Sequence, residues 1–196
     1  MAKIGFEYVV MGKLTSGTDT SATAATYTDG MYMGPNAAFN FSPNANDVKD
    51  YGDDRVTETD TSVIDGTISV EHNELTMEQE AYMLGHATVA AVTGSGGHPA
   101  YIVSTASDVA PYLGIGFVGK SRRSGSSVYT AKFYYKCQFR EPSDDNATKQ
   151  DSTAFTHTTL EGNMFTLQDG SWRKAAEFDS LSAAKAWLDG IVNITA

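Results

Sequence analysis

The sequence is poor in cysteine and contains no long hydrophobic run. Cys137 is the single cysteine among 196 residues, which excludes a small secreted module held together by disulfides. No stretch reaches the about 18 consecutive apolar residues that a membrane-spanning helix needs. The first residues, MAKIGFEYVVMGKL, have neither the length of a secretory hydrophobic region nor a small-residue cleavage pattern. We therefore expect a protein that is made in a cytoplasm and stays soluble.

Positive charge is also scarce. Lysine and arginine total 14 against 24 aspartate and glutamate residues, which gives a formal charge of −10 and a pI near 4.7. Specific binding of DNA or RNA usually needs a basic patch that neutralises phosphates. The densest basic cluster is Lys120, Arg122 and Arg123, and three charges in one short segment are typical of a solvated turn in an acidic protein. The composition therefore argues against a nucleic-acid-binding protein.

The strongest structural signal is the stretch VYTAKFYYKCQFR from Val128 to Arg140. Its side chains alternate between two faces, which is the period of a β-strand. One face carries Tyr129, Ala131, Phe133, Tyr135, Cys137 and Phe139, and the other carries Thr130, Lys132, Tyr134, Lys136, Gln138 and Arg140. At ~3.3 Å per residue this strand reaches roughly 40 Å. Its long row of backbone donors and acceptors favours pairing between sheets of neighbouring copies.

The rest of the chain predicts one mainly β domain over residues 1–196, with one or two short flanking α-helices and extended loops or arms. The capping box Thr76-Met77-Glu78-Gln79 starts one helix, which ends at Gly85 and packs its apolar face, Met77, Ala81 and Leu84, on the sheet. A second helix runs from Asp179 or Ser180 to Gly190. Further strands are expected at Ile4–Met11, Ala37–Phe41, Val63–Glu71, Thr88–Val92, Tyr101–Ser104, Leu113–Val118, Ser152–Thr159 and Asn163–Leu167.

Two polar segments are predicted to lack regular structure. The first is a mobile arm at about residues 12–28, with its Thr/Ser/Ala/Gly-rich part from Thr15 to Thr28, and the second is a long loop from Ser42 to Asp60. Their length and low apolar content make them candidates for contacts between copies of the protein. Deleting the arm is expected to leave a folded subunit that cannot elongate an assembly.

Residues Gly114 to Ser121, GIGFVGKS, match the phosphate-binding pattern GxxxxGK[ST]. In a nucleotide hydrolase this loop precedes a helix whose free N–H groups hold the phosphate. Here Ile115, Phe117 and Val118 are typical of a strand, and the residues after Ser121 lead through a turn into the long strand. We therefore interpret the pattern as half of a hairpin and expect no cofactor. A nucleotide hydrolase is kept as a third hypothesis, to be tested with Lys120→Ala.

No catalytic or metal-binding motif is evident elsewhere. His72, His86, His98 and His157 are far apart and lack the short spacings of zinc sites. The acidic residues Asp50, Asp53, Asp54, Glu58 and Asp60 lack the ligand order and the glycine of a calcium loop. A solvated acidic loop is the simpler interpretation. No nucleophile motif such as GxSxG appears, so the sequence predicts neither an enzyme nor a metal site.

Three blocks of the chain resemble a known family. They are YGDDRVTETDTSVIDGTISVEHNEL, APYLGIGFVGKSRRSGSSVYTAKFYYKCQFREPSDDNATKQDS, and TLEGNMF followed by DGSWRKAAEFDSLSAAKAWLDG. The second block is the most specific, because an apolar glycine-containing strand, a basic hairpin, a long strand ending near Glu-Pro and a polar loop follow in the same order. Together they resemble the major tail proteins of long-tailed, non-contractile bacteriophages of Gram-positive hosts. The Ala/Thr-rich segment from Thr15 to Thr28 departs from that pattern.

The resemblance implies a β-sandwich with a flanking helix, and a structural virion protein that forms hexameric rings, which stack into the hollow tail tube. It also implies contacts with tape measure, tail terminator and distal tail proteins, and passage of double-stranded DNA without specific binding. Our candidate assembly residues are Thr15, Thr28, Asp53, Asp54, Lys132, Tyr134, Lys136 and Arg140. A lumen bearing much of the negative charge would repel DNA, whereas Lys132, Lys136 and Arg140 would make the polar face of the long strand less acidic than the chain as a whole.

Two alternatives remain open at this point. A tube subunit of a headless, phage-derived bacteriocin would have the same sequence features. A monomeric carbohydrate- or surface-binding β-sandwich is suggested by the aromatic pair Tyr134 and Tyr135, if these side chains are exposed.

Overall fold

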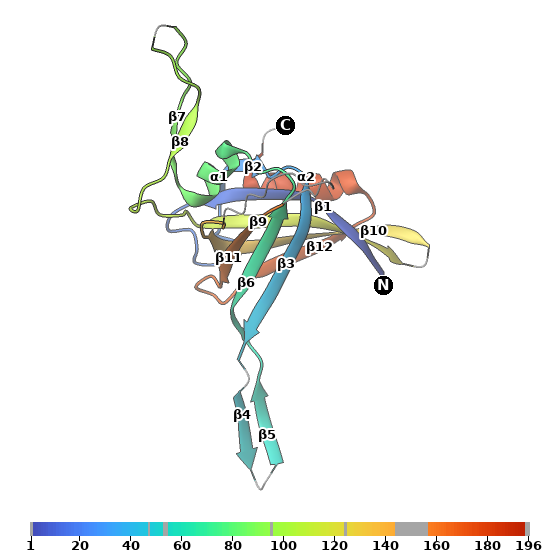
Figure 1. Ribbon diagram of the computed structural model, residues 1–196. Helices are drawn as coiled ribbons and strands as arrows, with labels where there is room; N and C mark the ends of the chain where they lie inside the picture. Colours follow the sequence, from blue (N-terminus) through green and yellow to red (C-terminus); the bar gives the residue numbers. More distant parts are fainter. Residues whose placement is uncertain are drawn as a thin grey trace, which may run out of the picture.

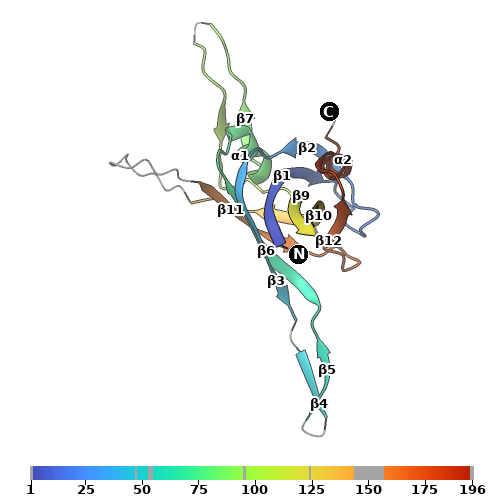
Figure 2. The same cartoon turned by 90° about the vertical axis from the view of Figure 1, so that its right-hand side faces the viewer.

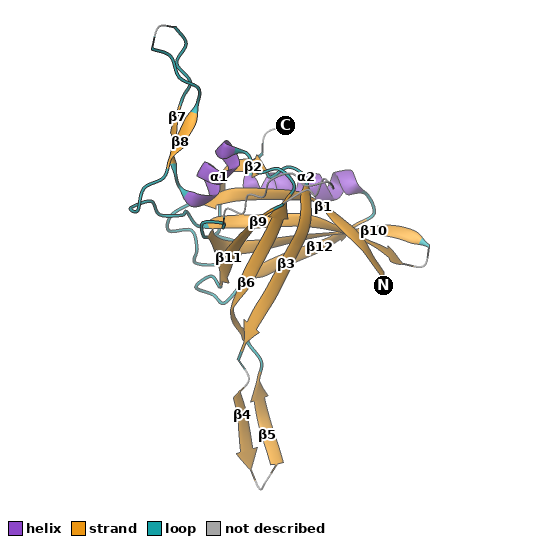
Figure 3. Cartoon of the chain, viewed as in Figure 1, coloured by secondary structure: helices purple, strands orange, loops and turns teal. Residues whose placement is uncertain are grey.

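The computed structural model describes residues 2–46, 48–52, 55–94, 96–123, 125–143 and 157–194. Within these ranges the chain forms twelve strands and two helices (Figures 1 and 3). Every strand pairing is antiparallel. The expectation of a mainly β fold with short flanking helices is therefore confirmed.

One large sheet forms the body of the protein. Its strands follow the order β2, β1, β9, β10, β11, β6, β3, and β12 also pairs with β10. The bounds are β1 (Ala2–Leu14), β2 (Tyr27–Tyr32), β3 (Asn36–Ala45), β6 (Val63–His72), β9 (Leu113–Arg123), β10 (Ser126–Phe139), β11 (Thr158–Phe165) and β12 (Arg173–Phe178). The expected hairpin between the glycine-containing strand and the long strand is the β9–β10 pair. The sequence patterns did not predict β2 or β12 as strands. Of the expected strand Ser152–Thr159, residues 152–156 lie outside the described residues. Thr158 and Thr159 belong to β11, which also contains residues 163–165 of the expected strand Asn163–Leu167.

The strand β10 is the point at which the sheet folds over. One of its edges pairs with β9, while the other is divided between two partners. Tyr129–Tyr134 face β12, and Lys136–Phe139 face β11. Between Tyr134 and Cys137 the register with β9 shifts, and such an irregularity displaces the alternation of side chains by one residue.

This irregularity corrects the predicted two-faced pattern of the long strand. Ala131, Phe133 and Tyr135 pack into one hydrophobic cluster, whereas Tyr134, Cys137 and Phe139 pack into the other. Cys137 and Phe139 therefore do not share a face with Phe133, as uniform alternation predicted. Both faces of β10 are buried because the sheet is covered on one side by its own folded-over half and on the other by α2.

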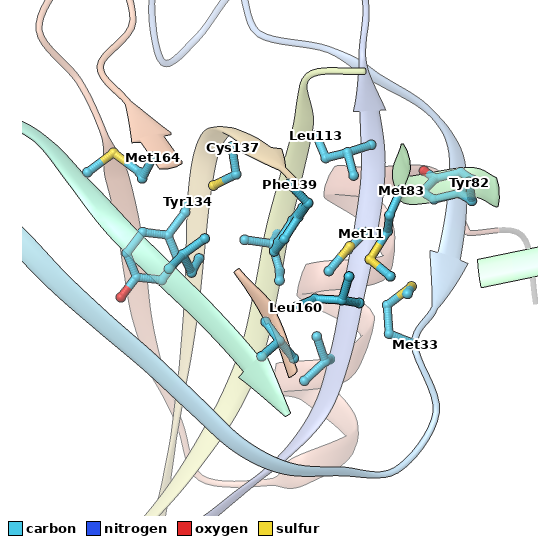
Figure 4. Close-up of a cluster of buried hydrophobic side chains, with 14 of the residues drawn as sticks. Met11, Met33, Tyr82, Met83, Leu113, Tyr134, Cys137, Phe139, Leu160 and Met164 are labelled. Atoms are coloured by element: carbon cyan, nitrogen blue, oxygen red, sulfur yellow. The ribbon is translucent and has the colours of Figure 1, made fainter. Parts of the chain in front are cut away.

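The two clusters occupy opposite faces of the sheet. The first lies between its folded halves and includes Met11, Met33, Met83 and Met164 (Figure 4). The second lies under α2 (Leu181–Val192) and contains Phe133, Tyr27 and Leu188. Methionine side chains adapt to irregular gaps, which suits the space inside a strongly bent sheet.

The capping box at Thr76 is confirmed. The Gln79 amide N–H donates to Thr76 Oγ1 over 3.2 Å, and the Thr76 N–H donates to Gln79 Oε1 over 3.0 Å. The helix α1 (Met77–Leu84) ends at Gly85, whose φ of 80° is the left-handed cap expected. Met77, predicted on the buried face, is 54% exposed, and Met83 is buried instead.

The second helix starts where its sequence predicts and extends further. Ser180 is the N-cap, and its hydroxyl accepts a hydrogen bond from the Ala183 N–H. The helix passes through Gly190 and ends at Asn193, whose φ is 58°. Asparagine tolerates this left-handed conformation, and burial of Val192 in the second cluster holds the last turn in place.

Two hairpins leave the body in opposite directions (Figures 1 and 2). One is β4 (Val48–Gly52) with β5 (Arg55–Asp60), and the other contains β7 (Ala87–Val89) with β8 (Tyr101–Val103). The predicted loop from Ser42 to Asp60 is wrong, because its start belongs to β3 and most of the remainder to the β4–β5 hairpin. The segment lacks the apolar alternation that marks a half-buried strand, and pairing of its own backbone builds the hairpin.

The predicted mobile arm at 12–28 is corrected as well. Residues 12–14 belong to β1, residues 27–28 belong to β2, and residues 15–26 form a loop tied to the body. The Gln168 N–H donates to the Asp19 carbonyl over 3.1 Å, and the Ala22 N–H donates to Asp169 Oδ2 over 3.2 Å. Tyr27 is 1% exposed and its hydroxyl donates to the Tyr135 carbonyl over 2.8 Å. Deleting Thr15 to Thr28 would remove this core residue, so we now expect unfolding instead of a folded subunit.

A buried histidine makes the stability of this core depend on pH. His72 is completely buried at the end of β6, and burial lowers the pKa of its imidazole, which the nearby polar backbone of Met33 opposes only in part. Among the described residues, neither ring nitrogen of His72 has a hydrogen-bond partner. Because the unfolded chain binds a proton at about pH 6.5 and the folded chain resists it, stability falls as the pH drops below that value.

We expect His72→Leu to reduce this acid sensitivity. Thermal unfolding measured from pH 8 to pH 5 should show a smaller loss of Tm in His72→Leu than in the native chain. His98→Gln, which removes a histidine from the β7–β8 hairpin instead of the core, is the matched control. An equal loss of Tm in the native chain and in His72→Leu would contradict the assignment to His72.

Candidate functional site

The phosphate-binding pattern is part of the central sheet. Gly114 to Ser121 lie within β9, which pairs with β1 on one edge and β10 on the other. Gly116, for example, is opposite both Val10 and Phe133. Backbone N–H groups in a doubly paired strand are used by the sheet and cannot cradle a phosphate. The interpretation of this pattern as half of a hairpin is confirmed.

Packing explains two of the three glycines in this segment, Gly114 of the pattern and Gly116 at one of its variable positions. A Cβ atom at Gly114 would lie 2.4 Å from Phe133 Cζ, and one at Gly116 would lie 2.7 Å from Leu188 Cδ2. At Gly119 the nearest atom would be 3.7 Å away, which is ordinary contact. Gly114 and Gly116 thus leave room for Phe133 and for α2, which gives them a structural role that needs no nucleotide.

Tyr134 is not available as an assembly contact. It is 2% exposed, and its ring centroid lies 4.8 Å from that of Phe41 and 5.8 Å from that of Phe39. Tyr135 is 4% exposed and belongs to the second cluster. The aromatic pair that suggested a carbohydrate-binding surface is therefore inside the core, because each face of β10 is covered.

The basic residues of the long strand are engaged within the subunit. Lys136 Nζ lies 2.8 Å from Asp19 Oδ2 and 4.4 Å from the centroid of the Tyr112 ring. The hydrogen bond from Lys136 holds the pKa of the Asp19 carboxyl below its usual value. Lys132 Nζ lies 6.0 Å from the Phe117 ring centroid. The charge of Lys136 is thus balanced locally by Asp19.

The other predicted assembly residues are scattered. Arg140 is exposed just beyond β10, and its backbone N–H donates to the Glu161 carbonyl over 2.9 Å. Thr15 begins the 15–26 loop, where its N–H donates to the Thr26 carbonyl over 2.9 Å, and Thr28 is exposed on β2. Asp53 and Asp54 lie outside the described residues. Among the described candidates, Thr15 and Lys136 line one pocket of about 250 Å³, and the other candidates do not line it.

Exposed apolar side chains instead mark a surface that sequence reasoning missed. A groove of about 630 Å³ lies between the start of α1 and the β7–β8 hairpin. Met77 and Tyr101 line it and are 54% and 43% exposed. Val92 and Val103, also on the hairpin, are 53% and 40% exposed. Apolar groups gathered in this way typically mark a site of protein contact. The helix pattern placed Met77 on the buried face, so only its exposure in the structure reveals this surface.

The sheet also offers edges for pairing. In the described part of the chain, β3 pairs with β6 on one side and has no partner strand on the other, and β12 pairs only with β10. Pro43 lies on β3, and proline is tolerated on an edge strand because it needs no donor there. Free edges of this kind are templates for pairing with another chain.

The four histidines lie in different surroundings. His72 is in the core, His98 is on the β7–β8 hairpin, and His157 Nδ1 is 2.8 Å from Glu71 Oε1. His86 is buried beside carboxylates from three segments. Of the acidic residues considered for calcium, Asp50 belongs to β4, and Glu58 and Asp60 belong to β5.

None of the helices in the described ranges has the length and apolar character needed to cross a membrane. Comparison of the sequence with protein-family models gave no match, and comparison with curated proteins gave none.

Proposed function

We propose that this protein is a structural subunit that assembles with copies of itself into stacked rings, forming the hollow tail tube of a long-tailed bacteriophage. The observation that carries the proposal is the pair of hairpins that leave the body in opposite directions (Figure 1). A two-stranded hairpin gains little stability by itself in water. Hairpins at both ends of a subunit are suited to reaching the neighbours above and below it.

Stacking of this kind is heterologous, because a surface at one end of the subunit meets a different surface at the other end. Such contacts repeat without closing and produce a filament or tube until another component stops them. The groove lined by Met77 and Tyr101 lies at the root of the β7–β8 hairpin. In this proposal its occupant is the next copy of the chain, which covers the exposed apolar side chains.

Contacts within a ring would use the sheet. The edges of β3 and β12 are open to pairing in the described part of the chain, and joining sheets edge to edge around an axis removes exposed edges by closure. The resemblance to major tail proteins supplies the ring of six as part of the proposal. Tape measure, tail terminator and distal tail proteins would be the partners inside and at the ends of the tube.

The charge of the chain is compatible with a DNA conduit. A formal charge of −10 disfavours adhesion of DNA, and the pairing of Lys136 with Asp19 reduces the basic character of β10. The protein would act in the virion after synthesis in the host cytoplasm, and it would have no catalytic role. A carbohydrate-binding module is not carried forward, since Tyr134 and Tyr135 are buried.

Negative-stain electron microscopy of the purified protein over a concentration series tests this proposal. We expect rings or hollow tubes whose number rises with protein concentration, because assembly through weak repeated contacts follows mass action. A parallel sedimentation measurement should show the matching loss of small species. Particles of uniform, monomeric size at every concentration, even with preformed tube ends added as initiators, would count against a tube subunit.

A further inference from the structure

Four side chains from separate segments meet beside the C-terminal end of α1. Glu80 is on α1, and His86 lies between the cap residue Gly85 and the first residue of β7. Asp108 belongs to the connection between β8 and β9, and Glu141 follows β10 by two residues. The fold therefore brings together residues that are as much as 61 positions apart, from Glu80 to Glu141.

His86 is held in a defined orientation. Its side chain is 2% exposed, and Nδ1 lies 2.8 Å from Asp108 Oδ2. Asp108 is itself fixed by Thr105, whose N–H donates to Oδ2 over 3.0 Å. A carboxylate at Nδ1 favours the proton on that nitrogen, so that the lone pair of the neutral ring is at Nε2.

The other ring nitrogen faces two more carboxylates. Nε2 is buried and makes no hydrogen bond of acceptable geometry among the described residues, although Glu141 Oε1 lies 2.8 Å away. One ligand atom from each of Glu80, His86 and Glu141 lies within 4.8 Å of the others. A buried ring nitrogen without a properly directed hydrogen bond is uncommon, and a cation between the three groups would satisfy all of them.

We propose that Glu80, His86 and Glu141 form a binding site for a divalent transition-metal ion, for which Zn²⁺ is the best match. Zinc accepts imidazole nitrogen together with carboxylate oxygen, and three protein ligands leave a fourth position for water. The imidazole disfavours Ca²⁺ and Mg²⁺, which prefer oxygen ligands. Asp108 is the positioning residue, since a carboxylate that accepts the other N–H is the usual orienting partner of a zinc-bound histidine.

Charge and geometry agree with this choice. Two carboxylates and a neutral imidazole together carry the charge that neutralises one divalent ion. Around Zn²⁺ at about 2.0 Å, ligand atoms are separated by roughly 3.3 Å, so separations within 4.8 Å require only a small movement of the side chains. Glu141 is 61% exposed at its side chain, which leaves it free to make that movement and provides an entry path.

The site would connect three parts of the fold. It would join α1, the root of the β7–β8 hairpin and the segment that follows β10. Metal binding should therefore raise the stability of the isolated subunit, whether or not the protein forms tubes. The inference is thus independent of the proposed function.

The test uses the full chain, first treated with a chelator and then dialysed. Isothermal titration calorimetry and thermal unfolding are followed with ZnCl₂, and with CaCl₂ and MgCl₂ in parallel. We expect one Zn²⁺ per chain with an increase in Tm, and no comparable effect of Ca²⁺ or Mg²⁺. Glu141→Gln should weaken Zn²⁺ binding at least about 10-fold, and Asp108→Asn by about 10–100-fold.

Glu78→Gln is the matched control, because Glu78 is exposed on α1 and lies outside the cluster. It should bind Zn²⁺ as the native chain does. Since Glu141 is exposed, its variant is expected to fold, which circular dichroism verifies. Absence of Zn²⁺ binding in the native chain would overturn the proposal and leave an ion-paired histidine. Binding that Glu141→Gln and Asp108→Asn leave unchanged would also overturn it, by placing the metal elsewhere.

Discussion

Phe133→Asp is expected to leave the chain unfolded at 25 °C. Phe133 is completely buried on β10, where its ring lies 5.0 Å from that of Tyr27 in an edge-to-face arrangement. The ring packs directly against Gly114 and Gly116, where a Cβ atom would collide with it. Aspartate would remove the packing and place a charge in the space. The combined cost of at least about 4 kcal/mol approaches the whole stability of a typical domain.

The nearest ammonium group does not rescue this variant. Lys174 Nζ lies 5.4 Å from the centroid of the Phe133 ring, and burial lowers the pKa of Lys174. A second charge in the same partly desolvated place would need its own solvation. We therefore expect loss of the native near-ultraviolet circular dichroism and loss of a cooperative thermal transition.

Two controls separate the position from the chemistry. Phe133→Leu keeps an apolar side chain and should remain folded with a loss of about 1–2 kcal/mol. Ser127→Asp adds the same charge to an exposed position of the same strand and should change stability by no more than about 0.5 kcal/mol. A folded Phe133→Asp protein with native Tm would show that the core assignment of this face is wrong.

If the protein assembles into tubes as we propose, replacing the β4–β5 hairpin with a short turn should abolish tube formation while leaving the subunit folded. The excision is defined by the structure, because the Asn46 N–H donates to the Ser62 carbonyl over 2.8 Å. Residues 47–61 can therefore be exchanged for a Gly-Ser turn without stretching β3 or β6. If the hairpin makes contacts between rings, its loss removes those contacts from every interface between stacked rings.

Electron microscopy and sedimentation measure the outcome. We expect the excised protein to keep the native circular dichroism and a Tm within a few degrees, but to remain as single subunits or single rings at concentrations where the native protein forms tubes. A full-length variant with Asp53→Asn and Asp54→Asn keeps the length of the hairpin and removes two of its negative charges, so it distinguishes an effect of length from an effect of charge. Normal tubes after excision would mean that stacking depends on other surfaces, such as the groove beside β7–β8.

Local patterns were reliable where a few neighbouring residues determine the conformation. The capping box at Thr76 and the left-handed glycine at Gly85 define a helix through contacts within one or two turns. The β9–β10 hairpin followed from the alternation and the intervening polar turn. The interpretation of Gly114 to Ser121 as a strand of this hairpin is confirmed for the same reason, since its inner residues are those of a strand.

Patterns failed where distant segments supply the partner. Tyr27 is a core residue because α2 and β10 surround it. The residues next to it in the sequence are small and polar, and they give no pattern that predicts its burial. Tyr134 had the spacing of a polar-face residue, but the folded-over half of the sheet covers it with Phe39 and Phe41. The hairpin β4–β5 was taken as a loop because it has no apolar alternation, and its strands are defined by backbone pairing.

The candidate metal site shows the same limit. Its members come from four segments, so no ligand spacing in the chain marks it, and the histidines looked unremarkable one by one. The β-rich class, the caps of α1 and the strand character of β9 and β10 can be predicted from the residues alone, because they depend on local conformational preference. The buried face of each strand, the directions of the hairpins and the meeting of His86 with Glu80, Asp108 and Glu141 require the folded structure, because they depend on how the sheet bends and folds back on itself.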